Sequence, residues 1–326
     1  MYKDLVARAL QSPLGDHLLR VLERADGGRP NLFKVLTYHR MSDPEGFDRQ
    51  MAYLAAHYNV ISVPDLLSAL QEDRRLPPRS VAITFDDAYQ SFGEIAWPIL
   101  ERHRLPATLF VATGYPDRPE MVFWWDKVEE AFQRTACRDP LESPLGPLPM
   151  GTAPERMRSL KRLKGYLKKL PQPEIVQRAE EIAGRLGAPP RTNDVLGWEA
   201  LRRLSGQGVT LGAHSRNHPL MDRIPADEAL AEVVGSLEDL RREIGQTPPI
   251  FAYPDGRYTR ETIDVLRRAG IALAFTTRRG ANVLGRTAAL ELRRINISRC
   301  SPTSVLRLRL IHSSVYLNRW QPLFDS

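Results

Sequence analysis

Apolar and polar positions alternate along most of this chain in a way that predicts strands followed by helices. Apolar runs of strand length are expected at 32–38, 60–63, 80–84, 107–113, 209–213, 250–253, 272–277 and 294–297. Helical periodicity is expected at 1–28, 47–58, 64–71, 91–103, 198–207, 227–244 and 259–269. Strands that alternate with helices at this spacing are typical of βα units built around a mostly parallel sheet.

The alternation is interrupted by a long segment in the middle of the chain. It is rich in proline, carries the run Phe123-Trp124-Trp125, and has helical patterns at 127–132, 154–170 and 173–186. Because it is too long for an ordinary loop, we expect an inserted helical cap that shapes a site. The predicted organisation is an N-terminal amphipathic helix at 1–30, a barrel at 31–300 interrupted by the insertion 115–197, and a basic C-terminal tail at 301–326.

Composition narrows the class of protein. The chain has 326 residues and a net charge of +7. It has only two cysteines, and this number excludes a disulfide framework and a thiolate metal site. Basic residues cluster at 156–169 and 293–309, and since no nucleic-acid motif accompanies them we interpret both clusters as solvated helix faces. The tail at 301–326 is expected to pack on the barrel or to lie on a membrane.

The expected location is the cytoplasm. No apolar run approaches the ~20 residues that a membrane span needs. The N-terminus lacks the layout of a secretory signal, in which basic, apolar and small residues follow one another. Contact with the inner face of the membrane stays open, because a basic protein can bind acidic phospholipid or a sugar pyrophosphate.

Two adjacent carboxylates, Asp86 and Asp87, follow the apolar strand at 80–84. Neighbours in an extended segment point in different directions, so the two can have different roles. One can bind a cation while the other stays free as a base. The alternative is that they form a helix N-cap and an acid of the first helical turn.

Two histidines follow another strand of the same predicted sheet. His214 and His218 are four residues apart, which on a helical turn puts both rings on one face. This spacing alone often arises by chance, but functional groups of parallel α/β folds gather at the carboxyl ends of the strands. We therefore expect Asp87, His214 and His218 to bind a divalent metal, with a water in an open position.

The remaining roles follow from this chemistry. Asp86 can take a proton from the water as general base. His39, at the end of the strand at 32–38, is the expected general acid, the alternative being a hydrogen-bonded core histidine. The reaction class is metal-assisted hydrolysis of an amide or ester.

These residues resemble a known family. Thr84-Phe-Asp-Asp87 and His214-Ser-x-x-His218-Pro219 resemble the first two motifs of the polysaccharide deacetylases, the carbohydrate esterase family 4 with the NodB-homology fold. The resemblance implies a distorted (β/α) barrel, zinc or a similar cation, and removal of N-acetyl groups from amino sugars. It also implies that Asp86 is the base and that Asp87, His214 and His218 are the metal ligands.

The third motif departs from the family pattern, in which an arginine orients the catalytic aspartate. Here the sequence is Ala252-Tyr-Pro254-Asp255-Gly256, so Pro254 matches and Ala252 replaces the arginine. Pro254 and Asp255 are expected at the substrate, with a backbone N–H near Asp255 as oxyanion donor. The sequence does not indicate what orients Asp86.

The early Tyr38-His39 resembles the exopolysaccharide-associated branch of the family, in which such a histidine can serve as the acid. His312, in Leu310-Ile-His312, is the alternative acid. Trp124 and Trp125 are expected either to form a wall on which a sugar stacks or to anchor the cap to the barrel.

The expected function is a metal-dependent hydrolase that removes N-acetyl groups from an amino sugar in a polysaccharide, a lipid-linked precursor or a glycolipid. Zinc is the expected metal, with cobalt, nickel and iron left open. One alternative is hydrolysis of another C–N bond, such as a cyclic amide, on the same fold. A second is an inactive carbohydrate-binding protein, which only the missing arginine of the third motif supports.

Overall fold

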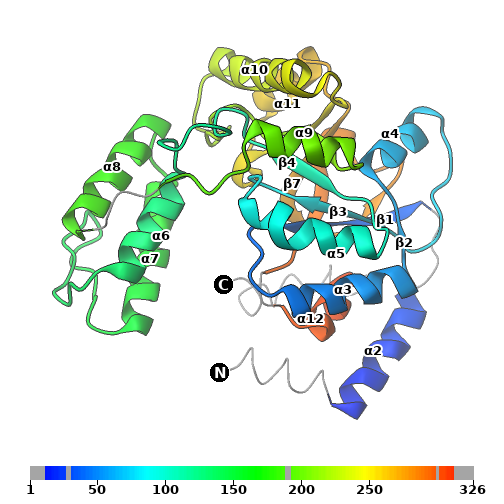
Figure 1. Cartoon of the computed structure of the whole chain (residues 1–326), viewed down its shortest axis with the longest axis horizontal. Helices are drawn as coiled ribbons and strands as arrows, with labels where there is room; N and C mark the ends of the chain where they lie inside the picture. The colour runs from blue at the N-terminus through cyan, green and yellow to red at the C-terminus, as the bar shows by residue number, and fades with distance from the viewer. Residues whose placement is uncertain (1–11, 27–30, 188–191, 299–300, 312–326) are drawn as a thin grey trace.

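A closed barrel of seven parallel strands forms the centre of the molecule (Figure 1). The computed structural model describes residues 12–26, 31–187, 192–298 and 301–311. Around the barrel the strands are β3 (Ser80–Phe85), β4 (Thr108–Val111), β5 (Thr210–Ala213), β6 (Ile250–Ala252), β7 (Leu273–Arg279), β9 (Leu292–Asn296) and β1 (Leu32–Tyr38). Pairing of β1 with β3 closes the ring. The predicted distorted (β/α) barrel is therefore confirmed.

Two short strands extend the sheet, and helices cover its outside. β2 (Asn59–Val60) runs parallel to β3, and β8 (Asn282–Val283) pairs antiparallel with β1. The covering helices are α3 (Pro44–His57), α4 (Val63–Gln71), α5 (Trp97–Arg102), α9 (Trp198–Gly206), α10 (Ala226–Ile244) and α11 (Arg260–Arg268). Single helical turns lie at η1 (Phe92–Ala96), η2 (Pro254–Gly256) and η3 (Ala289–Glu291).

The strand expected at 60–63 is wrong beyond its first residue, because α4 begins at Val63. Ser62 caps this helix by accepting the backbone N–H of Asp65 at 3.0 Å, and the Asp65 carboxylate accepts the Ser62 N–H. Such a reciprocal capping box satisfies two backbone donors that a helix start would otherwise leave free. The capping residues therefore override the apolar pattern that suggested a strand.

Residues of the predicted insertion form a helical cap beside the barrel, on the left of Figure 1. The cap contains α6 (Trp124–Arg134), α7 (Ala153–Leu167) and α8 (Gln172–Arg185). It has a hydrophobic core of its own, in which Trp124, Val128, Leu163 and Ile175 are buried together with Leu220 of the barrel. Leu220 lies just past His218, so the cap packs against the segment that carries the predicted metal ligands.

The described part of the predicted basic tail belongs to the packed fold. Residues Thr303–Leu310 form α12, which packs on α3 and on α2 (Pro13–Asp26). Leu306 and Leu310 are fully buried in the barrel's outer core. This agrees with packing on the barrel rather than with lying on a membrane, and His312 and the residues after it lie outside the described part of the chain.

A buried ion pair joins α2 to α12. Arg307 donates from Nε and Nη2 to the two carboxylate oxygens of Glu23, at 2.7 and 3.0 Å, and Tyr53 donates to the same carboxylate at 2.6 Å. Burial raises the pKa of Glu23, but the hydrogen bonds from Arg307 and Tyr53 lower it more, so the net pKa lies below its ordinary value. The charged pair therefore stabilises the fold at neutral pH.

Glu23→Gln should lower the free energy of unfolding by about 2 kcal/mol at pH 7, since it removes a charge-assisted hydrogen-bond pair. Glu23 contributes its full stabilisation above its unfolded pKa and loses it as the pH falls through the lower folded pKa. The difference between wild type and variant in urea unfolding should therefore shrink from pH 7 to pH 4. An equal difference at both values would contradict the prediction, and Glu199→Gln, at an exposed acid of α9, is the control.

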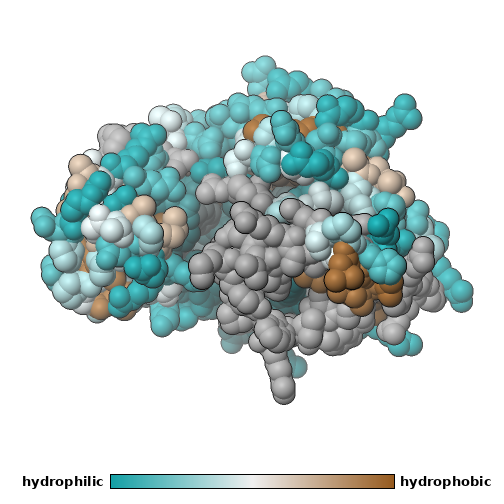
Figure 2. Space-filling model, turned by 90° about the horizontal axis from the view of Figure 1, so that it is seen from below, coloured by the Kyte–Doolittle hydropathy of each residue, from teal (hydrophilic) through white to brown (hydrophobic). Residues whose placement is uncertain are grey.

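On the face shown in Figure 2 the described residues are mostly hydrophilic, with some brown areas among the teal. Three of the exposed large apolar side chains, Leu14, Leu18 and Val21, lie on α2. No helix among the described residues combines the length and apolarity needed to cross a membrane.

Candidate active site

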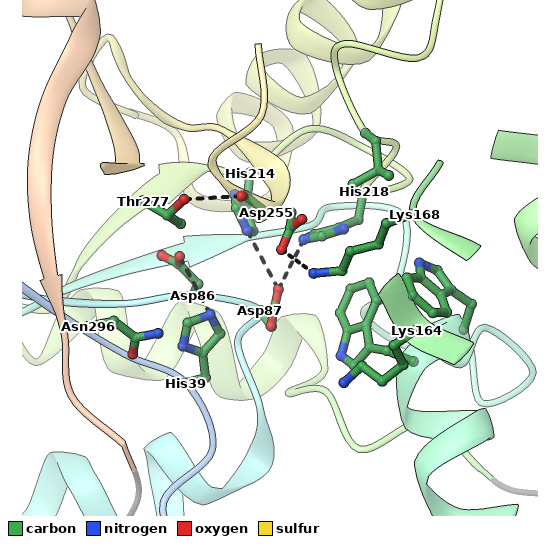
Figure 3. A pocket seen from close by; sticks show the side chains of 13 residues that line it. His39, Asp86, Asp87, Lys164, Lys168, His214, His218, Asp255, Thr277 and Asn296 are labelled. Atoms are coloured by element: carbon green, nitrogen blue, oxygen red, sulfur yellow. Dashed lines mark hydrogen bonds and ion pairs between the residues drawn. The ribbon is translucent and has the colours of Figure 1, made fainter. Parts of the chain in front are cut away.

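A pocket of about 290 Å³ opens where the carboxyl ends of the barrel strands face the cap. The barrel contributes residues that follow β1, β3, β5 and β6 and residues near the ends of β7 and β9. The cap contributes side chains of α6, of α7 and of the residue after α7 (Figure 3). The lining residues are His39, Asp86, Asp87, Trp124, Trp125, Lys164, Lys168, His214, His218, Leu220, Asp255, Thr277 and Asn296. The pocket thus brings together eight of the nine residues to which the sequence assigned a role.

Asp87, His214 and His218 form a compact buried cluster. Oδ1 of Asp87 lies 3.5 Å from Nε2 of His214 and 3.4 Å from Nε2 of His218. These separations fit one metal ion, because two ligand atoms on tetrahedral bonds of about 2.1 Å lie about 3.4 Å apart. Oδ1 of Asp87 is buried and has no hydrogen-bond partner, so the cluster offers an acceptor that a cation would satisfy.

The protonation state of His214 also suits a metal ligand. Its Nδ1 lies 2.7 Å from the carbonyl oxygen of Ala252, to which it donates when Nε2 is the free nitrogen. Burial lowers the pKa of His214 to about 4, in spite of the nearby charges of Asp86 and Asp87. The ring is therefore neutral at pH 7, with its Nε2 3.5 Å from Oδ1 of Asp87.

The two histidines meet through an irregular turn rather than through the expected helical turn. Ser215 and His218 have positive φ angles of 62° and 54°, and the Ser215 hydroxyl accepts the His218 backbone N–H at 3.0 Å. The Glu232 carboxylate accepts two further backbone N–H groups of the turn, at 2.9 and 2.7 Å. The ring centroids of His214 and His218 still lie 4.7 Å apart. The two side chains therefore meet as predicted, although the backbone between them is not helical.

Arg294 is the functional residue that sequence reasoning missed. Its Nη1 and Nη2 each donate to one carboxylate oxygen of Asp86 at 2.7 Å, and its Nε donates to the Thr276 carbonyl at 2.9 Å. Burial raises the pKa of Asp86, but the charge of Arg294 and the hydrogen bonds that it donates lower this pKa by more, so that it lies well below the ordinary range. Asp86 is therefore ionised and held in one orientation.

The interpretation of 293–309 as a solvated helix face is wrong at Arg294, which is 1% exposed. Arg294 lies on β9, where its side chain points to the same side of the sheet as Leu292. The arginine that the third motif lacks at Ala252 is thus supplied from another strand of the same barrel. The sequence contained one indication of this role: Arg294 is a charged residue in a predicted strand, at a position that faces the inside of the barrel.

His39 lies at the pocket beside Asp86. Its Nε2 is 3.9 Å from Oδ2 of Asp86, and its side chain is 40% exposed. This is the most exposed of the predicted catalytic residues, so His39 is not a buried core histidine. A partly exposed ring at this place can reach both substrate and solvent.

The predicted substrate-contacting residues separate into three kinds. Asp255 lines the pocket from η2, whereas the neighbouring Pro254 is buried and does not belong to the lining, so substrate contact by Pro254 stays a prediction. Trp124 lines the pocket but is 5% exposed within the cap core. Trp125 is more exposed, and its ring centroid lies 4.6 Å from that of His218.

Backbone strain is concentrated at this edge of the barrel. Asp87, Ser215, His218 and Asp255 all have left-handed φ angles, between 53° and 70°. Each such non-glycine residue costs roughly 1–2 kcal/mol, and strained residues of this kind cluster at functional sites. The packing of the barrel therefore stabilises a set of loop conformations that the local sequence does not favour.

The match to known proteins agrees with this geometry. The family model described as polysaccharide deacetylase matches residues 73–140 and 148–274, which together are more than half of the chain. The chain belongs to the polysaccharide deacetylase family. The match includes Asp86, Asp87, His214, His218 and Asp255, and it ends before β9.

Curated relatives align with part of this family member. A poly-beta-1,6-N-acetyl-D-glucosamine N-deacetylase of Escherichia coli (strain K12) is 29% identical over 101 residues, which are 27% of this chain and 15% of the relative. One of the same name from Staphylococcus aureus (strain N315) is 34% identical over 70 residues, or 21% of this chain and 24% of the relative. The aligned part is thus less than a quarter of each relative's length.

Solved structures share the fold of this family member over most of its length. The Streptococcus pyogenes deacetylase PplD, in complex with acetate, superposes with a TM-score of 0.58 and 22% identity, covering 87% of this chain and 99% of that one. IcaB from Ammonifex degensii gives a TM-score of 0.56 and 19% identity, covering 86% and 96%. At these identities the likeness concerns the fold.

Proposed function

We propose that this chain is a metal-dependent hydrolase that removes N-acetyl groups from an amino sugar of a polysaccharide or of its lipid-linked precursor. The observation that carries the proposal is the pairing, within one pocket, of the Asp87, His214 and His218 cluster with Asp86 held by Arg294. Family membership supports the hydrolase, and the names of the relatives support a polymer of N-acetylglucosamine as the substrate.

Asp87, His214 and His218 would hold the metal, for which zinc is the proposed identity because nitrogen and carboxylate ligands suit it. When bound, such an ion would lower the pKa of a water and polarise the acyl oxygen of the substrate. The chain supplies the rest: it keeps His214 neutral, keeps Asp87 ionised and lines one side of the pocket with side chains of the cap.

Asp86 and His39 would carry the two proton transfers. Asp86 accepts a proton from the attacking water, and the new C–O bond forms at the acetyl carbon. His39 then donates a proton to the sugar nitrogen as the C–N bond breaks, so that acetate and a free amine leave. Arg294 fixes both carboxylate oxygens of Asp86 in place. Asp86 would therefore orient the attacking water as well as accept its proton.

The cap would bind the sugar ring. Trp125 lines the pocket next to His218, and an aromatic face suits the apolar face of a pyranose. The backbone N–H of Asp255 is the proposed donor to the acyl oxygen as it becomes negative. Placement in the cytoplasm and contact with the inner membrane face stay predictions.

Removal of the metal should abolish the reaction. Purified protein is expected to release acetate from β-1,6-linked N-acetylglucosamine oligomers, to stop after chelation, and to recover when zinc is returned. Asp87→Ala, which removes a ligand, should neither bind the metal stoichiometrically nor recover. Release that is indifferent to the chelator, or full activity of Asp87→Ala, would contradict the proposal.

A further inference from the structure

The end of the cap helix α7 is joined to the strained loop that carries Asp255. Nζ of Lys168, the residue that follows α7, donates to Oδ1 of Asp255 at 2.5 Å (Figure 3). Nη1 of Arg257 donates to the carbonyl oxygen of Lys168 at 2.8 Å. Lys168 thus donates one hydrogen bond to this short loop of the barrel and accepts another from it.

Arg257 extends this connection to the loop of the predicted metal ligands. Its Nε and Nη2 both donate to Oδ2 of Asp222, at 3.0 and 2.7 Å. Asp222 lies four residues after His218. One guanidinium therefore joins the cap, the loop of Asp255 and the loop of His218, three segments that line one pocket.

The loop after β6 needs such support because its conformation is unfavourable. Asp255 has φ 53° and ψ 11°, and Gly256 follows with φ 67°. A side chain at position 256 would meet Thr277 at 2.1 Å, so the loop lies directly against β7. The Thr277 hydroxyl donates to the Asp255 carbonyl at 3.2 Å, which fixes the backbone, while Lys168 fixes the carboxylate.

We propose that Lys168 is a positioning residue of the active site, which holds Asp255 so that its backbone N–H faces the acyl oxygen of the substrate. This inference rests on the proposed deacetylase function. It makes the cap a support of the catalytic loop as well as a wall of the pocket. An error of about 1 Å in the place of a catalytic group can cost up to 100-fold in rate, so a weak surface contact can have a large kinetic effect.

Lys168→Met should lower kcat for acetate release about 10-fold and leave KM within about twofold, because the oxyanion donor acts mainly in the transition state. Lys168→Arg keeps the charge and the reach, so it should recover most of kcat. The matched control is Lys169→Met, which removes the same charge from an exposed neighbour and should change neither constant.

A double-mutant cycle tests whether Lys168 acts through Asp255. Asp255→Asn should lower kcat by a similar factor, and adding Lys168→Met to it should cause no further loss. Additive losses, a change confined to KM, or a Lys168→Met enzyme that behaves like Lys169→Met would each overturn the proposal.

Hydrogen exchange separates this proposal from the proposed function, since it needs no substrate. Amides of residues 253–258 should exchange several-fold faster in Lys168→Met than in wild type or Lys169→Met. If wild type releases no acetate but this difference is seen, the function is wrong and the support by Lys168 holds. Equal exchange in all three proteins overturns the support by Lys168 whatever the activity.

Discussion

Replacing Arg294 with methionine should lower kcat for acetate release about 100-fold or more, although Arg294 does not belong to the lining of the pocket. The substitution removes both hydrogen bonds that orient Asp86 and leaves its charge buried without a partner. Loss of one member of a buried ion pair costs about 3–5 kcal/mol, so the variant should also unfold at a lower urea concentration. Steady-state kinetics and urea unfolding measure the two effects.

Two further variants keep this prediction testable if Arg294→Met folds poorly. Arg294→Lys retains the charge but cannot make the paired hydrogen bonds, so it should fold well and still lose much of its activity. In an Asp86→Asn background, Arg294→Met should be less destabilising, because no charge is left unpaired. Full activity of Arg294→Lys would show that orientation of Asp86 is unimportant.

Asp86→Asn should lower kcat about 100- to 10,000-fold while one metal ion per chain stays bound. The amide keeps the shape of the side chain but cannot take a proton. Asp87→Asn should instead weaken metal binding, because Asp87 and not Asp86 belongs to the ligand cluster. Kinetics together with metal analysis of both variants separates the roles of these two neighbours.

Loss of the metal from Asp86→Asn, or retention of more than a tenth of the wild-type kcat, would contradict the assignment of Asp86 as the base. The comparison is strict because the two residues are adjacent, equally buried and chemically identical. The environment separates them: Asp87 has a left-handed φ of 70° and lies beside His214 and His218, whereas Asp86 is held by Arg294.

The sequence was sufficient for the features that depend on local patterns. Mostly apolar runs predicted β1 and β3. His39, Asp86 and Asp87 were predicted as site residues because they directly follow these strands. His214 and His218 were found from spacing, although the backbone between them is not helical. Apolar patterns were not sufficient at Ser62, where the capping hydroxyl starts helix α4 at Val63, inside the strand predicted at 60–63.

Features that depend on the closed barrel could not be read from the sequence. Arg294 meets Asp86 only because β9 pairs with β1, and β1 with β3. Lys168 reaches Asp255 only because the cap packs beside the loop after β6. In both cases the contact joins segments that are far apart in the chain. Each of these basic residues lies in a cluster of like charges, which is why the sequence suggested that both were exposed to solvent.

Barrel closure also has a consequence for how the protein folds. β1 pairs with β9 through Leu36 and Ile295, so the ring is completed by segments from near the two ends of the described chain. Such non-local pairing forms slowly, because most of the chain must first be brought together. Asp86 therefore gains its countercharge only when the last barrel strand docks. During refolding, and during synthesis on the ribosome, helical structure will precede competence for catalysis, so activity reports the final assembly step.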